Sequence, residues 1–257
     1  MIAVPACTPS ELLSYVLRYQ ASSTVIVCQS REAFLSSLLL AVSTTLSVLQ
    51  SSSSSQASET DATVPDHPTS NTTAMPHHLL LQTLDQISKA RHINMVFVPS
   101  IAHLRAHLAV LRPKSSIKPT ESGNPSSDCR ESFLIYGLVD IHRDTSEWSV
   151  QGLAAVVAAA AEAAHRLKTS VFLIEELSAL DEWNDDQKAE ELVDSEAQRE
   201  IVWQQKLPML NGSLRRQFSA DDPGVERWIG RTVEVGSVLS RWCEFAETDF
   251  WMKHTTS

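Results

Sequence analysis

The apolar run FLIYGLV at residues 133–139 is the feature that most constrains the fold of this chain. It is almost continuously apolar and stops at Asp140, which is typical of a central parallel strand that is covered on both faces. An alanine-rich helical pattern follows at residues 148–167, and another short apolar run lies at residues 171–174. This order predicts a β-α-β unit within a parallel sheet.

The same alternation of strand and helix patterns runs through the N-terminal half. The apolar spacing predicts strands at residues 24–28 and 93–98, and helices at residues 10–19, 30–49, 78–90 and 101–111. Such alternation predicts an α/β fold, with a mainly parallel central sheet and helices on both faces.

The C-terminal part has a different pattern. Residues 205–214 and 231–245 alternate polar and apolar side chains in the manner of antiparallel strands. We expect them to form an antiparallel extension at one edge of the sheet. Residues 217–229 between them are predicted to be an exposed connecting loop.

Two polar segments interrupt the periodic pattern. Residues 51–76 hold a serine run followed by threonines and prolines, and they carry too few apolar side chains to offset their chain entropy. We therefore predict that 51–76 is a disordered insert and that 113–130 is a polar linker. The remaining roughly 200 residues can bury one core, so residues 1–257 are expected to form a single domain.

Composition limits the classes of function. The net charge of −10 argues against a general nucleic-acid binder, because phosphate contacts need a positive field. The four cysteines lack CxxC spacing, so buried thiols are expected rather than a disulfide framework or a zinc site.

The first ten residues have no Lys or Arg and two prolines, which argues against a signal peptide. Residues 33–49 contain six Ser or Thr side chains, too polar for a membrane span. We expect a nuclear or cytoplasmic protein that is not secreted and does not enter a membrane.

A phosphate-binding loop is missing where the fold would carry one. The strand at residues 24–28 and the next helix are joined only by Gln29, Ser30 and Arg31, without a glycine, and the chain has no Gly-Lys pair. A phosphate cradle needs glycines to turn backbone N–H groups inward and a lysine to reach the outer phosphates. ATP is therefore not expected to bind here in the usual way, and no cofactor is predicted.

Three segments resemble the RecA-like ATPases. LIYGLVD at residues 134–140 is similar to a Walker B strand, which puts Asp140 at a degenerate Walker B position. LPMLNGSLRR and GRTVEVGSVLSRWCEF look like the late strands of the eukaryotic RecA-family recombinases and their paralogues. The chain departs from the family with CQSREAF at the Walker A position and with Glu175 and Glu176 in place of the sensor glutamine. It also has Pro99 and Ser100 after the strand that would precede a catalytic glutamate. The resemblance therefore implies a single RecA-like domain without ATP hydrolysis.

Such chains resemble non-catalytic subunits of two kinds. The first is the recombinase-paralogue partners of the Shu complex, which implies a subunit of a homologous-recombination repair complex that supports recombinase filaments. Its expected partner is another RecA-like subunit, bound through a sheet edge or through the aromatic C-terminal region. The second is the small RecA-like subunits of Elongator, which implies a role in transfer-RNA modification. A third alternative is a small-molecule enzyme with a pocket lined by Asp140, His142 and Glu175.

Arginines interleaved with aromatic residues form the candidate contact region. Its members are Arg215, Arg216, Arg227, Arg231 and Arg241, with Trp228. This composition suits single-stranded DNA and protein hot spots equally well, and it also fits a solvated edge with tryptophans in the core.

Two other groups are candidate ligand sites. Asp140, with His142, Arg143 and Asp144, fits either a relic metal or phosphate site or a loop whose polar groups cap the next helix. His103 and His107 have the i, i+4 spacing of zinc ligands, but HLRAH lacks the glutamate of the HExxH pattern and no third ligand is evident. We predict neither a metal nor a catalytic residue.

Overall fold

A computed structural model describes most of the chain. The described residues are 1–18, 23–54, 77–81, 83–112, 132–143, 145–177, 195–209, 216–217, 227–228, 231–247 and 250–251.

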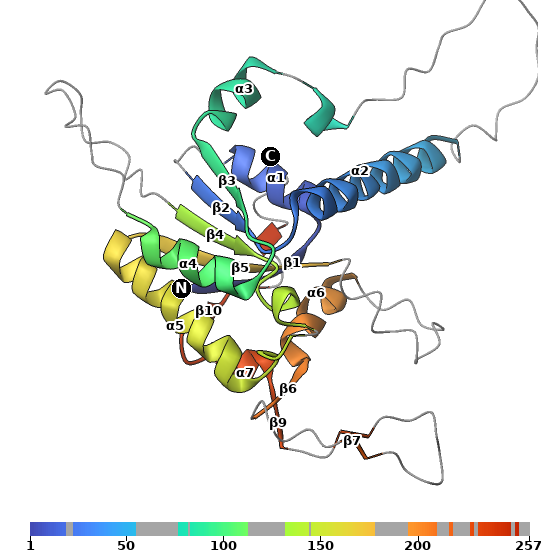
Figure 1. Ribbon diagram of the computed structural model, residues 1–257. Coiled ribbons are helices and arrows are strands. Elements are labelled where there is room, and N and C mark those ends of the chain that lie inside the picture. The colour runs from blue at the N-terminus through green and yellow to red at the C-terminus, as the bar shows by residue number, and fades with distance from the viewer. Residues whose placement is uncertain are drawn as a thin grey trace, which may run out of the picture.

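The core of the fold is a six-stranded parallel sheet (Figure 1). Its strands are β1 (Ile2–Cys7), β2 (Ser23–Val27), β3 (Ile93–Phe97), β4 (Ser132–Tyr136), β5 (Ser170–Glu176) and β10 (Glu244–Phe245). They lie in the order β10-β1-β5-β4-β2-β3, and each neighbouring pair is parallel. The predicted α/β class is confirmed, as is the β-α-β unit, because β5 pairs directly with β4.

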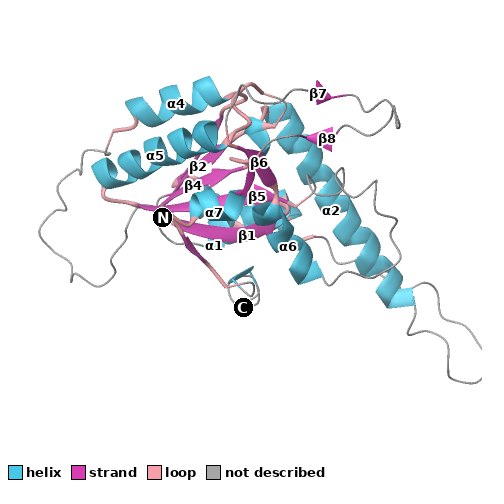
Figure 2. Ribbon diagram, turned by 90° about the horizontal axis from the view of Figure 1, so that it is seen from below, coloured by secondary structure: helices cyan, strands magenta, loops and turns pink. Residues whose placement is uncertain are grey.

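Helices cover both faces of the sheet, as predicted. On one face, α1 (Pro9–Arg18) and α2 (Arg31–Ser54) contribute to a buried cluster that includes Leu12, Tyr15 and Phe34. The other face is covered by α4 (Ile101–Val110), α5 (Val150–Leu167), α6 (Ser195–Gln204) and α7 (Val235–Leu239). Figure 2 shows α4 and α5 side by side on that face. Among the described residues, no helix has the length and apolar character needed to cross a membrane.

Strand β1 was not predicted, since the sequence favoured an opening helix without a strand before it. Its run IAVPAC contains Pro5, which cannot donate a backbone hydrogen bond to a neighbouring strand. The β1–β5 register shifts between Val4 and Cys7, so the proline sits at an irregularity of the ladder. Its carbonyl accepts a hydrogen bond of 2.7 Å from the buried indole Nε1 of Trp251.

Other boundaries differ for local reasons. Strand β4 ends at Tyr136, earlier than predicted, because Gly137 turns the chain with φ of 80°. The predicted helix at residues 78–90 is divided into a 3₁₀ turn (His78–Leu80) and α3 (Leu84–Ala90), which begins at a capping box of Thr83 and Gln86.

The predicted insert and linker lie largely outside the described residues. Helix α2 continues through Ser54, so the first residues of the segment 51–76 are helical. The rest of that segment, the linker 113–130 and Cys129 lie outside the described residues. Cys7, Cys28 and Cys243 are free and buried, as expected.

Antiparallel pairing in the C-terminal part is confirmed. Strand β6 (Lys206–Pro208) pairs with β9 (Thr232–Glu234), and β7 (Arg216–Gln217) pairs with β8 (Arg227–Trp228). Each pair is a separate two-stranded sheet, and the central sheet is extended instead by the parallel strand β10. Residues 235–239, predicted to be part of a strand, form α7. The ends of the predicted loop 217–229 lie in β7 and β8, and its middle is not described.

We predict that Gly152→Ala destabilises the fold by about 1–3 kcal/mol, as overpacking does. Gly152 is buried in the first turn of α5, and an added Cβ would overlap the carbonyl oxygen of Glu147. Chemical denaturation would measure the change. Gln151→Ala at the exposed neighbouring position is the control and is expected to shift stability by less than about 0.5 kcal/mol. Equal stability of both variants would show that the backbone at Glu147 can shift without lowering the free energy of unfolding.

Candidate functional site

The carboxyl edge of the sheet is where an open α/β fold places its ligands. The chain leaves β2 for α2 on one face and leaves β4 for α5 on the other, although β2 and β4 are neighbours. A change of face between adjacent strands is a topological switch point, and ligands bind in the crevice beside it. The residues that follow these strands therefore form the first candidate site.

Side chains of the protein itself fill this edge. The carboxyl Oε1 of Glu175 accepts a hydrogen bond of 2.8 Å from the Val139 N–H. Gln29 donates a bond of 3.1 Å to Oε2 of Glu176, and the Tyr136 hydroxyl donates one of 3.1 Å to the Cys7 carbonyl. Glu175 and Glu176 are both buried. These bonds connect the ends of β1, β4 and β5 with the residues after β2.

The electrostatics of this edge oppose a polyphosphate ligand. Burial raises the pKa of Glu175 to about 8, although the bond from Val139 acts in the opposite direction, and the nearby Asp140 carboxylate adds to the rise. Glu175 is therefore mostly protonated at neutral pH. A protonated carboxyl is a poor metal ligand, and its ionised form would repel phosphate.

The helix N-termini at this edge are also occupied. At α1, Glu11 accepts a bond of 2.8 Å from the Thr8 N–H, while its carboxylate is held by Arg199 at 2.6 Å. At α2, the Ser30 hydroxyl accepts a bond of 3.1 Å from the Ala33 N–H. These N–H groups are the ones that bind phosphate in nucleotide folds. Here internal acceptors already bind some of them, and neither strand-to-helix junction contains a glycine.

Asp140 lies beyond the end of β4, at the start of a 3₁₀ turn (Asp140–His142). Its carboxylate pairs with Arg143 at 3.1 Å, and its side chain is 40% exposed. The N-cap of α5 is Ser149, whose hydroxyl accepts a bond from the Gly152 N–H. Asp140 is therefore an ion-paired residue of the turn, and it does not cap α5.

His142 and Glu175 stabilise the turn after β4. His142 is fully buried, and its Nδ1 lies 2.7 Å from the Leu138 carbonyl. Burial lowers the pKa of His142, so the ring is neutral, and Nδ1 must carry the hydrogen because a carbonyl only accepts. Since both side chains are bonded to the backbone of residues 138–139, they are placed to hold the turn. An open pocket lined by Asp140, His142 and Glu175 is not supported by these contacts.

The histidine pair on α4 makes local contacts. The ring of His103 lies 2.7 Å from the Ser100 hydroxyl at the N-cap, and it is exposed. His107 is half-buried on the same helix. Within the described part of the chain, no three His, Cys, Asp or Glu side chains are grouped to hold a metal.

The arginine-rich region is brought together only in part. The β7–β8 ladder sets Arg216 opposite Trp228 and places Arg227 beside it. Arg231 and Arg241 are exposed, the first just before β9 and the second after α7. Arg215 lies outside the described residues.

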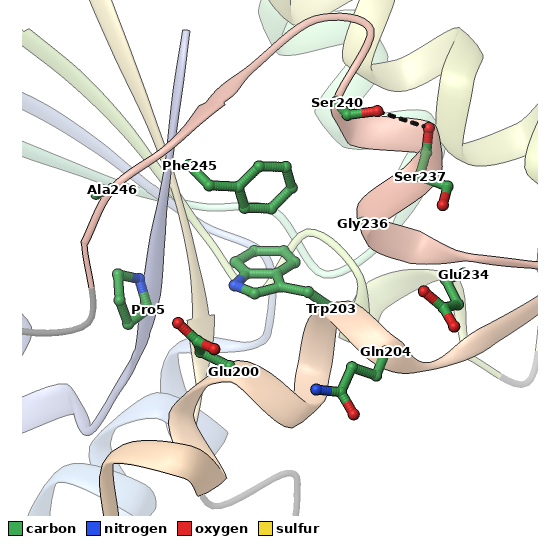
Figure 3. A pocket seen from close by; sticks show the side chains of 10 residues that line it. All are labelled: Pro5, Glu200, Trp203, Gln204, Glu234, Gly236, Ser237, Ser240, Phe245 and Ala246. Atoms are coloured by element: carbon green, nitrogen blue, oxygen red, sulfur yellow. Dashed lines mark hydrogen bonds between the residues drawn. The ribbon is translucent and has the colours of Figure 1, made fainter.

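A pocket that the sequence did not indicate lies beside β1 and β10, near the β10 edge of the sheet (Figure 3). It has a volume of about 440 Å³ and is lined from β1, α6, β9, α7 and β10. Trp203, Phe245, Glu200 and Glu234 are among its lining residues. The aromatic content of this region was visible in the sequence, but α7 was predicted as a strand, so the pocket could not be assembled from it.

Comparisons of this chain with protein-family models, curated proteins and solved structures gave no match.

We predict that Glu175→Gln flattens the dependence of stability on pH. The unfolded carboxyl releases its proton near its usual pKa, whereas the folded one retains it up to about 8. Stability is therefore fully present below the unfolded pKa and is lost as pH rises towards 8, by at most about 1.4 kcal/mol per pH unit. Glutamine keeps an acceptor for the Val139 N–H but cannot ionise.

Urea denaturation of both proteins between pH 5 and pH 8 would measure this. The variant should gain stability relative to the natural protein as pH rises, while Glu32→Gln on the exposed start of α2 should follow the natural protein. Parallel curves for Glu175→Gln and the natural protein would contradict the raised pKa.

Proposed function

We propose that this chain is a non-catalytic RecA-like subunit of a homologous-recombination repair assembly, and that it supports recombinase filaments through protein contacts. The recombination role is supported by the resemblance of LIYGLVD and of the late segments to recombinase paralogues. The absence of nucleotide chemistry is supported by the self-bonded carboxyl edge, where buried carboxyls stand in place of a phosphate cradle.

The open edge of β3 is the observation that carries the assembly role. Strand β3 is the last in the sheet order, and no described strand pairs with its outer side. Its bonds to β2 begin at the His92 carbonyl and end at the Val98 N–H. In a parallel ladder alternate residues bond the neighbour, so the N–H and C=O groups of Ile93, Met95 and Phe97 point outward. Such an edge is a template for a strand from another subunit.

Exposed leucines on helices connected to β2 and β3 suit the same role. Leu39 and Leu40 on α2 are 69% and 62% exposed, and Leu84 on α3 is 86% exposed. Helix α2 extends well past the sheet (Figure 1). These exposed apolar side chains are available to be buried by another protein. A second RecA-like subunit that adds a strand to β3 would lie near these helices.

The arginine-rich region supports single-stranded DNA as a second contact. The β7–β8 register sets Arg216 opposite Trp228, with Arg227 next in the chain, and arginine with an aromatic residue is a combination that suits backbone neutralisation and base stacking. Because the net charge is −10, this contact would be local and salt-dependent.

Purification of the tagged protein from its own cells, followed by mass spectrometry of the bound chains, tests the proposal. Recombinase paralogues in stoichiometric amounts would support it. Elongator subunits would move the function to transfer-RNA modification. Recovery without any stoichiometric partner would overturn an assembly role.

We predict that Met95→Pro abolishes partner binding while the domain remains folded. Proline removes the outward N–H of Met95 and puts its ring in the path of an incoming strand, whereas the inward bonds of residues 94 and 96 remain. Co-purification would measure binding, and thermal unfolding would verify the fold. Val110→Glu, at a 68% exposed position of α4 on the other face, is the control and should bind normally. Normal binding by Met95→Pro would exclude the β3 edge as the interface.

We predict that Arg216→Glu combined with Arg227→Glu lowers the affinity for a single-stranded oligonucleotide at least tenfold. The two changes reverse both charges on the β7–β8 ladder, and they should also reduce the salt dependence of binding. Fluorescence anisotropy at several salt concentrations would measure both effects. Partner capture should be unchanged, which separates this contact from the β3 edge. Unchanged DNA affinity would remove DNA from the proposal.

A further inference from the structure

The pocket beside β10 combines two aromatic rings with two carboxylates (Figure 3). It lies where the short edge strand β10 leaves β1 and where α6 packs against α7. Its lining also includes the apolar residues Pro5 and Ala246 and the polar residues Ser237 and Gln204. The chemistry of these walls decides what the pocket can hold.

The aromatic wall is formed by Trp203 and Phe245. Their ring centroids are 5.9 Å apart with an interplanar angle of 76°, so the two rings meet edge to face. Trp203 is anchored in the core, whereas Phe245 is 43% exposed. Phe245 is therefore held on one side by Trp203 and is the more exposed ring, and an aromatic ring of this kind can attract a cation.

The carboxylates flank this wall without bound cations of their own. Among the described residues, neither Glu200 nor Glu234 forms an ion pair with a lysine or an arginine. Lys206 is the register partner of Glu234 in the β6–β9 ladder but does not pair with its carboxylate.

Other nearby positive charge is committed elsewhere. The Arg199 guanidinium, next to Glu200 in sequence, is bound to Glu11 and to the Ala6 carbonyl. Within the part of the chain that the structure describes, no lysine or arginine lines the pocket. The pocket is therefore negative as well as aromatic, and this combination excludes an anionic ligand and favours a cationic one.

We infer that this pocket binds a guanidinium or ammonium group, presented by an arginine or lysine side chain of a protein partner. The head group lies against Phe245 and Trp203 between Glu200 and Glu234. The methylene stem of such a side chain contacts the apolar lining residues Pro5 and Ala246, since stems of this kind pack on apolar surface while the charge remains near water. The volume of about 440 Å³ also leaves room for part of the peptide that carries the side chain.

The inference relies on the proposed function only for the existence of a partner, because the pocket chemistry can be tested with peptides. Titration calorimetry with the full chain would use a short capped peptide with one central arginine, the same peptide with lysine, and the same peptide with citrulline. Citrulline has nearly the shape of arginine without its charge. The expected result is that arginine and lysine peptides bind and that citrulline binds at least tenfold more weakly.

Variants of the pocket complete the test. Glu200→Gln combined with Glu234→Gln should weaken the arginine peptide at least tenfold, and Phe245→Leu should weaken it severalfold. Glu162→Gln, at an exposed position of α5 outside the pocket, removes one carboxylate as a matched control and should bind normally. Thermal unfolding of each variant confirms that the fold is retained.

Each outcome decides a separate claim. Equal binding of the arginine and citrulline peptides, or no binding of either, would overturn the inference. Guanidinium ion that binds as tightly as the arginine peptide would support the cation chemistry and overturn the partner side chain as its source. Loss of peptide binding in the pocket variants with partner capture retained would support the inference and leave the β3 interface intact. If Met95→Pro loses partner capture but still binds the arginine peptide, the result would support a pocket that works independently of the β3 edge.

Discussion

Burial of the sheet on both faces is the constraint on which the rest of the structure depends. Strand β4 is buried at all five positions, and the last six residues of β5 are buried as well. Every crossover must therefore pass over one face or the other, and all polar groups at the strand ends gather at the same edge. The buried ones among them, Glu175 and Glu176, have little access to water, so they need hydrogen-bond partners within the protein. The bonds of Glu175 to Val139 and of Gln29 to Glu176 meet this requirement.

The way these groups are satisfied also decides what the edge can do. A nucleotide fold leaves N–H groups free at this edge for phosphate, and it pays a folding cost for doing so. Here the Glu11 carboxylate, which pairs with Arg199, accepts a hydrogen bond from the Thr8 N–H at the start of α1. Burial raises the pKa of Glu175 to about 8, so its carboxyl is mostly protonated at neutral pH. The bonds at this edge contribute to stability, and the proposed contacts lie at the sides of the sheet.

The extent to which sequence predicts this structure varies with the physical origin of each feature. Strands β2, β3, β4 and β5 lie close to their predicted positions, because each is an apolar run fully or partly buried in the sheet. Helices α4 and α5 were also found from their apolar spacing. By contrast, β1 was missed because Pro5 disfavours a strand unless a register shift accommodates it, and that shift is a tertiary feature. Residues 235–239 were predicted to continue a strand, yet Val235, Val238 and Leu239 have the i, i+3, i+4 spacing of a helix and are buried on one side of α7. Gly236 lies so close to α6 that an added Cβ would be 3.1 Å from the Trp203 carbonyl oxygen.

The candidate sites divide along the same line. The missing phosphate loop could be deduced from three junction residues and one absent dipeptide, because it depends on local chain chemistry alone. The protonated state of Glu175 could not be deduced from the sequence, since it depends on burial between β4, β5 and the turn at Gly137. The aromatic and acidic pocket could not be deduced either, because it requires α6, α7 and β10 to converge from separate parts of the chain. The pocket lies by β10 and the open strand is β3, so the two proposed contacts are at opposite ends of the strand order. The two proposed contacts would therefore use separate edges of the sheet and would not compete for the same surface.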